Sequence, residues 1–444
     1  MNADAFVIGA GVAGLAAAVR LAQHDRRVVV FEARGTSGGR ATSFDDRQGG
    51  PPLDNGQHAL MGCYHETLAF LAAIGSRDLV RVQPALSVSV VDTSGARSTL
   101  SCPSWPSPFQ MLAGVARWEA VPLAERVQLL RMAPALWRAR QVVATGRGDL
   151  PARDDETVRQ WLTRHGQGAR LTALLWEPLA VAALNQGIDA ASARPFVRVL
   201  GQVFGPGRDD ASIALVTRPL IDVVGRPAER FLSARGSRVV CHALARVELD
   251  GSQAVRIVLR DAAPVELHGR PVIVAVPWHA LPQVMAGDTT RVGPVLAAAA
   301  ATRPVSIVSV NLWFDRQVLD VPMLGIEGRS FQWAFAREGY VSLVMSGADA
   351  IVRERSDTIT ALALADLRHA VPAARAQAPT RTMAIREPRA TFSLRADQPA
   401  RPDTATAVAN LLLASDWVET GLPATIEGAA VAGRRAAEHI LSPR

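Results

Sequence analysis

A glycine-rich turn close to the N-terminus, Gly9-Ala10-Gly11-Val12-Ala13-Gly14, limits the folds open to this chain more than any other segment. A short apolar run, Ala5 to Ile8, precedes it, and a helical pattern from Leu15 to Gln23 follows it. A second apolar run, Arg27 to Phe31, then ends on the acid Glu32. G-x-G-x-x-G between a strand and a helix, with an acid about 20 residues further on, is the pattern of a dinucleotide-binding Rossmann unit. The sequence therefore predicts an α/β fold with a dinucleotide site at this turn.

Each residue of the pattern has a physical task in such a site. Gly9 permits the tight turn, Gly11 lets the backbone approach a pyrophosphate, and Gly14 lets the helix pack closely on the strand. The helix N-terminus presents free N–H groups and the positive end of its dipole to the phosphates. Glu32 is placed to accept hydrogen bonds from the adenosine ribose.

The residues after Glu32 favour FAD over a nicotinamide cofactor. They read Ala33-Arg34, then Gly38-Gly39-Arg40-Ala41. This segment resembles the glutathione-reductase-like flavoproteins of the amine oxidase and phytoene desaturase superfamily. The resemblance implies that Ala33, Arg34 and Gly39 line the pyrophosphate and ribityl chain of FAD, with Arg40 as a fixed cation for the phosphates. A surface salt bridge is the alternative role for Arg40.

A second cofactor segment is expected near the C-terminus. Asn410 to Ala414 reads as a buried strand, Asp416 follows it, and a helix is expected from about Thr425 to Ile440. The resemblance implies that Asp416 binds a ribityl hydroxyl and that the N–H groups of Thr425 and Ile426 face the flavin's pyrimidine edge. Glu427 has two open roles, a cofactor contact or the stabilisation of its own helix start.

The resemblance also implies a discontinuous cofactor domain. Leu244 stands in the strand that touches adenine in this superfamily, and Val272 to Pro277 looks like the strand that closes the subdomain. We therefore expect a glutathione-reductase-like FAD-binding Rossmann domain made of residues 1–75, 225–285 and 405–444. An inserted α+β substrate domain comprises residues 76–224 and 286–404.

Two further segments narrow the resemblance. Leu53-Asp54-Asn55-Gly56-Gln57-His58 follows the first cofactor motif, and residues 174–185 read LLWEPLAVAALN. Both are similar to the hydroxysqualene dehydroxylases, also called squalene-associated FAD-dependent desaturases. That family implies a C30 isoprenoid substrate, an allylic alcohol that exchanges its hydroxyl for a hydride from reduced FAD and becomes squalene, in hopanoid or sterol synthesis.

Candidates for the chemistry come from these segments. Asp54 and His58 are expected beside the flavin ring, with His58 either a proton donor near neutral pH or only a packing residue. Backbone contacts to the flavin are expected from Asn55 to His58.

Glu177 lies in an apolar helical stretch. Desolvation would raise the pKa of its carboxyl group, which suits an acid; the alternative is an ion pair between the domains. We expect Pro178, which follows it, to break or kink the helix. Candidate substrate contacts are Trp176, Asn185, Trp333 and Trp417.

Composition excludes several chemistries. The chain has 444 residues and a net charge of +7, and all 48 of its basic residues are arginine. Without lysine it can form no Schiff base and has no lysine general base. Amine oxidases of the superfamily typically place a lysine near flavin N5, and only two tyrosines are present to cage an amine. Amine oxidation is therefore disfavoured.

Charge and hydropathy also set expectations about partners. The arginines are dispersed, so we expect no nucleic acid, and the three distant cysteines predict neither a metal site nor disulfides, as in a reducing cytosol. No uninterrupted apolar run is long enough to span a bilayer. The segment Phe109 to Val143 is apolar at helical spacing with arginines between, which fits either a peripheral membrane face or an ordinary core-facing helix pair. A cytoplasmic protein, in peripheral contact with the inner face of the membrane, is the expectation.

Three alternatives stay open beside dehydroxylation. A carotenoid or other polyene desaturase would run the opposite redox direction on the same fold. A flavin amine oxidase is the second, and a non-catalytic prenyl-lipid-binding protein, like the GDP dissociation inhibitors, is the third. No second dinucleotide fingerprint is present, so the sequence does not identify the electron donor.

Overall fold

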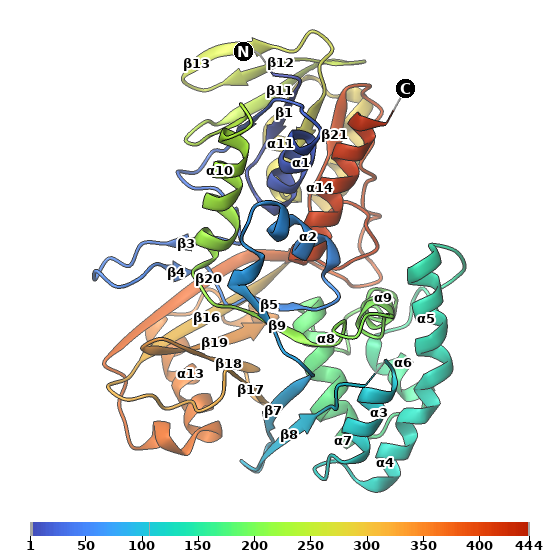
Figure 1. Ribbon diagram of the computed structural model, residues 1–444, viewed down its shortest axis with the longest axis vertical. Helices are drawn as coiled ribbons and strands as arrows, with labels where there is room; N and C mark the ends of the chain where they lie inside the picture. Colours follow the sequence, from blue (N-terminus) through green and yellow to red (C-terminus); the bar gives the residue numbers. More distant parts are fainter. Residues whose placement is uncertain (1–2, 106, 443–444) are drawn as a thin grey trace.

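The computed structural model describes residues 3–105 and 107–442. Its upper part in Figure 1 is built on a five-stranded parallel sheet in the order β10-β2-β1-β14-β21. The strands are β1 (Ala5–Ile8), β2 (Val28–Phe31), β10 (Arg238–Val240), β14 (Val272–Val274) and β21 (Leu411–Leu413). Every residue of β1 and β2 is buried, because layers cover both faces of the sheet. This confirms the predicted α/β class.

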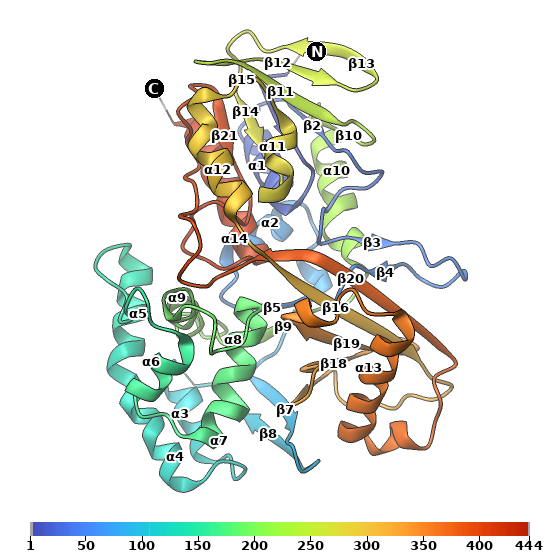
Figure 2. The same ribbon diagram turned by 180° about the vertical axis from the view of Figure 1, so that it is seen from behind.

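Helices from both ends and from the middle of the chain cover one face of this sheet (Figure 1). They are α1 (Val12–Gln23), α10 (Arg226–Ser233) and α14 (Ile426–Leu441), with α2 (His65–Ala73) below them. Helix α1 begins at Val12, three residues earlier than predicted, because Gly11 has extended backbone angles and serves as its N-cap. The opposite face carries α11 (Leu281–Val284) and α12 (Gly293–Ala301) (Figure 2). A four-stranded sheet caps this part, with β13 (Ala262–Glu266), β12 (Ala254–Leu259), β11 (Ala245–Asp250) and β15 (Met285–Asp288).

The N- and C-terminal segments of this part pack with their backbones in direct contact. A Cβ built on Gly433 of α14 would lie 2.3 Å from the carbonyl oxygen of Ala13 in α1. Strand β21 pairs with β14 in parallel register, Leu412 beside Ile273. The last 35 or so described residues therefore complete the sheet and cover α1.

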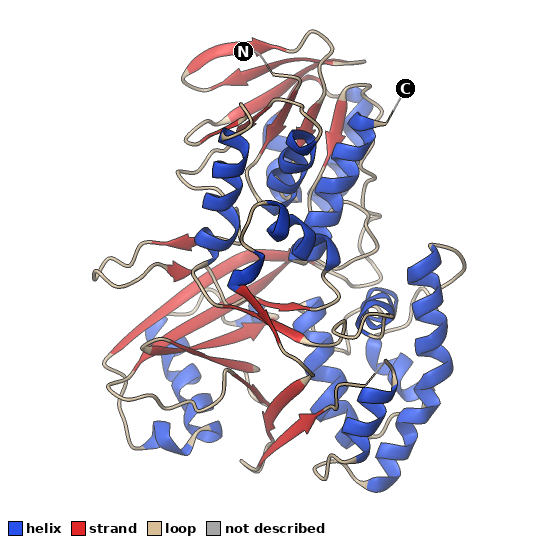
Figure 3. Ribbon diagram, in the orientation of Figure 1, coloured by secondary structure: helices blue, strands red, loops and turns tan. Residues whose placement is uncertain are grey.

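The lower part contains a seven-stranded sheet and a separate helical lobe, which Figure 3 distinguishes by colour. The sheet runs β20 (Arg381–Phe392), β16 (Pro304–Trp313), β19 (Tyr340–Ser346), β18 (Trp333–Arg337), β17 (Met323–Ile326), β7 (Ser87–Val91) and β8 (Arg97–Ser101). The lobe contains α3 (Phe109–Ala116), α4 (Leu123–Gln128), α5 (Ala133–Thr145), α6 (Val158–Arg164), α7 (Ala169–Leu171), α8 (Glu177–Leu184) and α9 (Ala193–Val203). A π-helical turn, Thr172–Trp176, leads directly into α8, whose first turn contains Pro178. The backbone stays helical through this junction, so the chain does not break at the proline, and the predicted kink stays a prediction.

Two small sheets join the parts. One pairs β3 (Ser43–Phe44) with β4 (Leu53–Asp54), and the other has the order β5 (Ala59–Met61), β9 (Ile213–Val216) and β6 (Val80–Val82). Short helical turns complete the chain at Arg77–Leu79, Leu129–Met132, Ile221–Gly225, Trp278–Ala280, Thr290–Val292, Ala348–Ala350 and Pro372–Arg375.

The two faces of the seven-stranded sheet differ in chemistry. Along β16, Val308, Val310 and Leu312 point to the apolar core that includes α13 (Ser356–Ala370). Because side chains alternate along a strand, Ser309 and Asn311 point to the opposite face. We call this opposite side the polar face of the sheet.

Candidate active site

The glycine turn is shaped by close backbone contacts. Gly9 has φ +101°, and a Cβ on it would lie 2.6 Å from the carbonyl oxygen of Ala275. A Cβ on Gly14 would lie 2.0 Å from the carbonyl oxygen of Gly9 itself. A Cβ on Gly11, in contrast, would meet only the Cα of Gly39, at 4.0 Å. The first and third glycines therefore pack the turn, and the second keeps its outer side open.

Glu32 is held in place by the turn that it follows. Its Oε2 accepts a hydrogen bond from the Ala10 N–H at 2.7 Å, and its Oε1 accepts one from the Arg34 N–H at 2.8 Å. Residues 242–243 run alongside, since the Ala243 N–H donates to the Glu32 carbonyl. Leu244, the next residue, is 39% exposed. The carboxylate and an uncovered apolar side chain thus flank the place where the resemblance puts the adenosine.

Arg40 joins the two cofactor segments of the sequence. Its Nη2 donates to Asp416 Oδ1 at 2.6 Å, and its Nη1 donates to the Ala390 carbonyl oxygen at 2.6 Å. The side chain of Asp416 is only 5% exposed, whereas that of Arg40 is 32% exposed. The ion pair therefore fixes both residues at one place, with the guanidinium still open to a further anion on its exposed side.

The residues at this place fit an FAD molecule. No side chain caps the N-terminus of α1, so its first N–H groups are available to phosphate oxygens. The free helix N-terminus, Glu32 and the Arg40–Asp416 pair are donors and acceptors of the kind that a dinucleotide requires.

The C-terminal helix begins where the sequence predicted. Thr425 is the N-cap of α14, and its Oγ1 accepts a hydrogen bond from the Gly428 N–H at 3.0 Å. Glu427 lies in the first turn of α14, as the role of stabilising its own helix start requires, and its carboxyl group also contacts a second helix. It is 3% exposed and accepts hydrogen bonds from Glu66 N–H (3.0 Å), Thr67 N–H (2.8 Å) and Thr67 Oγ1 (2.7 Å). Glu427 therefore caps the N-terminus of a different helix, α2, and ties it to α14.

The loop from Asp54 to His58 is anchored by its own side chains. Asp54 accepts hydrogen bonds from Ser43 Oγ at 2.7 Å and from the Leu220 N–H at 2.8 Å, and it pairs with Arg337 Nη2 at 3.3 Å. Arg337 Nε also donates to Gln57 Oε1 at 2.6 Å. With both oxygens engaged and 5% exposure, Asp54 positions the loop, which argues against the predicted catalytic role. Arg337, 280 residues away from Gln57, was not found from the sequence because no local pattern marks it.

The structure also argues against His58 as a proton donor. Its Nδ1 lies 2.9 Å from the Gly56 carbonyl oxygen, which can only accept, so Nδ1 carries the proton of the neutral ring. Burial lowers the pKa of His58 from its usual value, and the nearby carboxylate of Asp54 does not offset this. The ring is therefore neutral near pH 7, with Nε2 as an acceptor.

Glu177 lies in different surroundings. Burial raises the pKa of its carboxyl group, as the sequence predicted. The charges that act on it are those of Arg159, Asp189 and Glu327, whereas those that act on His58 are Asp54, Arg337 and Arg40, so the two groups share no charged neighbour. Glu177 is at the first residue of α8, eight residues from Asn185 and thus about 12 Å along the helix axis.

Asn185 ends α8 beside the strands of the lower sheet. It adopts the left-handed conformation with φ +55°, its Oδ1 accepts from the Gly347 N–H at 3.1 Å, and its Nδ2 donates to Thr391 Oγ1 at 2.9 Å. Its side chain therefore joins the helical lobe to the sheet, and both polar atoms are engaged. The amide keeps a second N–H and a second acceptor lone pair, so the substrate contact predicted for Asn185 stays a prediction.

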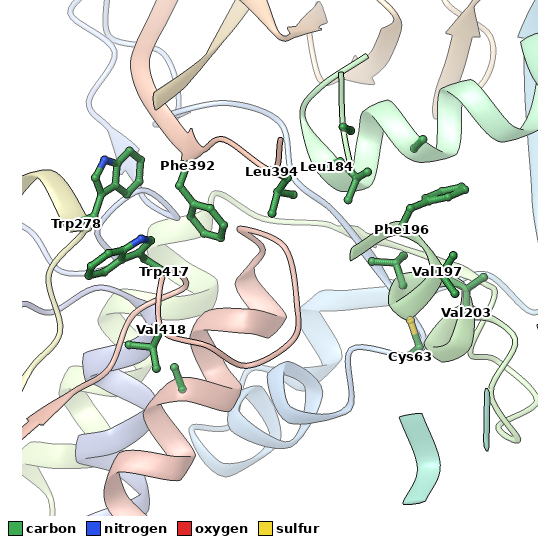
Figure 4. Packing of buried hydrophobic residues seen from close by; sticks show 14 of the residues in the cluster. Cys63, Leu184, Phe196, Val197, Val203, Trp278, Phe392, Leu394, Trp417 and Val418 are labelled. Atoms are coloured by element: carbon green, nitrogen blue, oxygen red, sulfur yellow. The ribbon is translucent and has the colours of Figure 1, made fainter. Parts of the chain in front are cut away.

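The predicted aromatic substrate contacts occupy three different places. Trp176 is completely buried and donates from Nε1 to Gln167 Oε1 at 3.0 Å, so it belongs to the core of the lobe and lines no open channel. Trp417 lies with Trp278 and Phe392 (Figure 4) and borders a cleft of about 370 Å³. That cleft is also lined by Arg194, Arg198, Arg395 and Arg401, which makes it unsuitable for a polyene. Trp333 stands on β18 of the lower sheet.

Comparisons with known proteins agree with this geometry. Residues 12–441 match the model of the family described as flavin containing amine oxidoreductase. The chain is similar to a hydroxysqualene dehydroxylase from Sinorhizobium fredii, at 29% identity over 100% of this chain and 99% of the relative. It is also similar to a 15-cis-phytoene desaturase from Synechococcus elongatus, at 22% identity over 98% of this chain and 95% of the relative.

A solved structure supports the fold independently of those sequences. An oxidoreductase from Methanosarcina mazei superposes with a TM-score of 0.72 at 16% identity, covering 98% of this chain and 99% of the other. The glycine turn, the Arg40–Asp416 pair and the α14 N-terminus occur along the chain in the order that the resemblance implies. The chain belongs to the flavin containing amine oxidoreductase family and is an FAD-dependent oxidoreductase.

Proposed function

We propose that the chain reduces hydroxysqualene to squalene in the synthesis of hopanoids or related triterpenoids. The observation that carries the proposal is the end-to-end similarity to relatives named hydroxysqualene dehydroxylase, at 28–29% identity over 98–100% of this chain. The desaturases match less closely, at 20–22% identity. The lack of lysine further disfavours amine oxidation.

The reaction breaks the C–O bond of an allylic alcohol and forms a C–H bond at the same substrate. Reduced FAD, when bound, supplies the hydride, and the hydroxyl takes up a proton and leaves as water. The chain must therefore hold FAD, bring a proton to the hydroxyl and keep bulk water away from the carbon that develops positive charge. Glu32, Arg40, Asp416 and the N-termini of α1 and α14 hold the cofactor.

The proton source is assigned to Glu177 as a proposal. Its raised pKa keeps a larger fraction of the carboxyl group protonated near neutral pH than an ordinary glutamate has. Neutral His58, with Nε2 as an acceptor, instead suits the orientation of a hydroxyl or of the flavin edge.

Two experiments test the proposal against its rivals. First, the purified protein is expected to be yellow, with the absorption spectrum of bound flavin; a protein that stays colourless after reconstitution with FAD rules out both polyene reactions and leaves the non-catalytic lipid-binding alternative. Second, the reduced holoenzyme is incubated anaerobically with hydroxysqualene, and squalene is expected as the product. Unreacted alcohol, together with dehydrogenation of a polyene by the oxidised enzyme, identifies a desaturase.

We further propose that the helical lobe contacts the inner face of the cytoplasmic membrane. Among the described residues no helix is both long and apolar enough to cross a bilayer. Of the eight exposed large apolar side chains found there, six fall between residues 105 and 137: Trp105, Phe109, Leu123, Val127, Leu130 and Trp137, at 48–71% exposure. Five arginines but only two glutamates lie between residues 105 and 140, a balance that attracts anionic lipids.

Vesicle sedimentation tests this contact. The holoenzyme is expected to pellet with vesicles of phosphatidylglycerol and phosphatidylcholine, and less with phosphatidylcholine alone. The variant L123S/V127S should reduce pelleting several-fold, whereas F44S, which removes an exposed apolar side chain outside the lobe, should not. Equal pelleting of both variants and the wild type contradicts a lobe-specific contact.

A further inference from the structure

Polar atoms without partners gather at one place on the polar face of the seven-stranded sheet. Among the described residues, nine buried side-chain nitrogen and oxygen atoms have no hydrogen-bond partner. Four of the nine belong to Asn311 (Nδ2 and Oδ1), Ser342 (Oγ) and Trp333 (Nε1). Asn311 is 1% exposed and Ser342 is 0% exposed, so water outside the protein does not satisfy them. Unpaired buried polar groups are costly, so such a cluster requires a cause.

Strand register puts the three side chains on neighbouring positions. Asn311 of β16 lies directly opposite Ser342 of β19. Ser342 lies opposite Phe335 of β18, and Trp333 is two residues from Phe335, on the same face. Directly opposed and diagonal neighbours on one face of a sheet are within reach of each other's side chains. Asn311 and Ser342 are thus direct neighbours, and Trp333 is the diagonal neighbour of Ser342, with its ring against Gly325 of β17. We call these three residues the Asn311 cluster.

The loop from Asp54 to His58 lies over the same face. A Cβ on Gly56 would be 3.6 Å from Ser309 Oγ, which is two residues from Asn311 on β16. Asn55 Nδ2 donates to Glu387 Oε2 at 3.4 Å, and Glu387 is opposite Ile307 on the same side of β16 and β20. The Asn311 cluster therefore lies on the face that carries the loop expected at the flavin.

We propose that the Asn311 cluster binds the hydroxyl group of the substrate. This inference rests on the proposed function and names the residues that recognise the alcohol. A hydroxyl oxygen accepts and its O–H donates, and the cluster offers both partners: Asn311 Nδ2 and Trp333 Nε1 donate, while Asn311 Oδ1 and Ser342 Oγ accept. Amide, hydroxyl and indole groups do not ionise near neutral pH, so the cluster binds and orients the C–O bond and leaves proton delivery to another group.

A site of this kind separates the alcohol from the hydrocarbon product. A pocket built to bind a hydroxyl rejects the analogue without it, because its own polar atoms are then left unpaired. Squalene, which has no hydroxyl, would leave the cluster as it is in the ligand-free chain. We therefore expect hydroxysqualene to bind the oxidised holoenzyme at least about tenfold more tightly than squalene does.

The test compares binding of the two ligands without turnover. Dissociation constants for hydroxysqualene and squalene are measured from the change in flavin absorbance of the oxidised holoenzyme. In N311L, which replaces the amide with an apolar group of similar size, and in S342A, the preference for the alcohol should fall at least about fivefold while squalene affinity is unchanged. W333F should lower the preference for the alcohol by a smaller factor than N311L or S342A, because only one donor is lost. N311L should also melt at the same temperature as the wild type or higher, since it removes unpaired groups.

Matched controls keep the outcomes separate. W118F removes another buried, unpartnered indole N–H, in the helical lobe, and should leave the preference unchanged. A wild-type preference in N311L and S342A, or an equal loss of affinity for both ligands, overturns the assignment; an internal water between Asn311 and Ser342 would produce the first of these results. A holoenzyme that binds hydroxysqualene no better than an unrelated polyene, and does not convert it, refutes the proposed function itself.

Discussion

Replacing Arg40 with glutamine should destabilise the protein even before FAD is added. Arg40 neutralises Asp416, whose side chain is 5% exposed, and satisfies the Ala390 carbonyl oxygen. Removing one partner of a fully buried ion pair costs about 3–5 kcal/mol, because the other charge stays buried and unpaired. The Arg40 side chain is 32% exposed, so water reaches the carboxylate that is left behind. We therefore expect R40Q to lower the free energy of unfolding by about 2–3 kcal/mol.

A double-mutant cycle in the FAD-free protein separates the contribution of the Arg40–Asp416 ion pair to stability from the loss of contacts with the FAD phosphates. The variants are R40Q, D416N and the double variant, each unfolded reversibly in urea and followed by tryptophan fluorescence. D416N should cost less than R40Q, about 1 kcal/mol, because the guanidinium that remains can be hydrated. The double variant should be less destabilised than the sum of the two, by at least about 1 kcal/mol, because it contains no unpaired charge. R355Q, at an ion pair that is 85% exposed, is the control and should stay within about 0.5 kcal/mol of the wild type.

Two results would refute the reasoning. If R40Q is as stable as R355Q, the buried Asp416 does not depend on its partner. If the effects of R40Q and D416N are additive, the two residues are not coupled. The contact between the two cofactor segments then contributes nothing to the free energy of unfolding.

Three further predictions concern the cofactor site and the acid. E427A should lower the stability by about 2–4 kcal/mol, because two N–H groups at the start of α2 and the Thr67 hydroxyl lose their acceptor, and thermal unfolding at the wild-type temperature would contradict the cap. G14A should purify without bound flavin, because its Cβ would overlap the Gly9 carbonyl, and a wild-type ratio of flavin to protein absorbance would contradict this. If protonated Glu177 is the acid, wild-type activity is high at low pH and falls as the pH rises through the raised pKa of its carboxyl group. E177Q should be slower and lack this fall in its pH–rate profile. An unchanged profile in E177Q removes Glu177 from the mechanism.

The nucleotide turn could be predicted because its signals are local. The strand, the three glycines, the helix and Glu32 all fall within about 30 residues. At each position the residue type follows from the backbone conformation or contact that the site needs there. The helix start differs by three residues because Gly11 adopts extended angles that its sequence context does not specify. The C-terminal segment was recognised for the same reason, since Asp416 and Thr425 follow a buried strand within one short stretch.

Contacts between distant residues could not be predicted. Arg337 reaches Gln57 across 280 positions, and Glu427 reaches Thr67 across 360, so no spacing rule connects them. The Asn311 cluster depends on the register of three strands, and single residues in it look like ordinary strand positions. The role of His58 stayed open because its pKa depends on burial, which cannot be read from the sequence.

The packing of α14 on α1 also orders events during synthesis. The glycine turn leaves the ribosome well before strand β21, Asp416 and α14, and until those segments emerge β14 has an open edge and α1 an uncovered apolar side. A nascent chain that stops short of residue 411 thus exposes both surfaces and cannot hold FAD. Incomplete chains of this kind should be recognised by chaperones and proteases through these two surfaces.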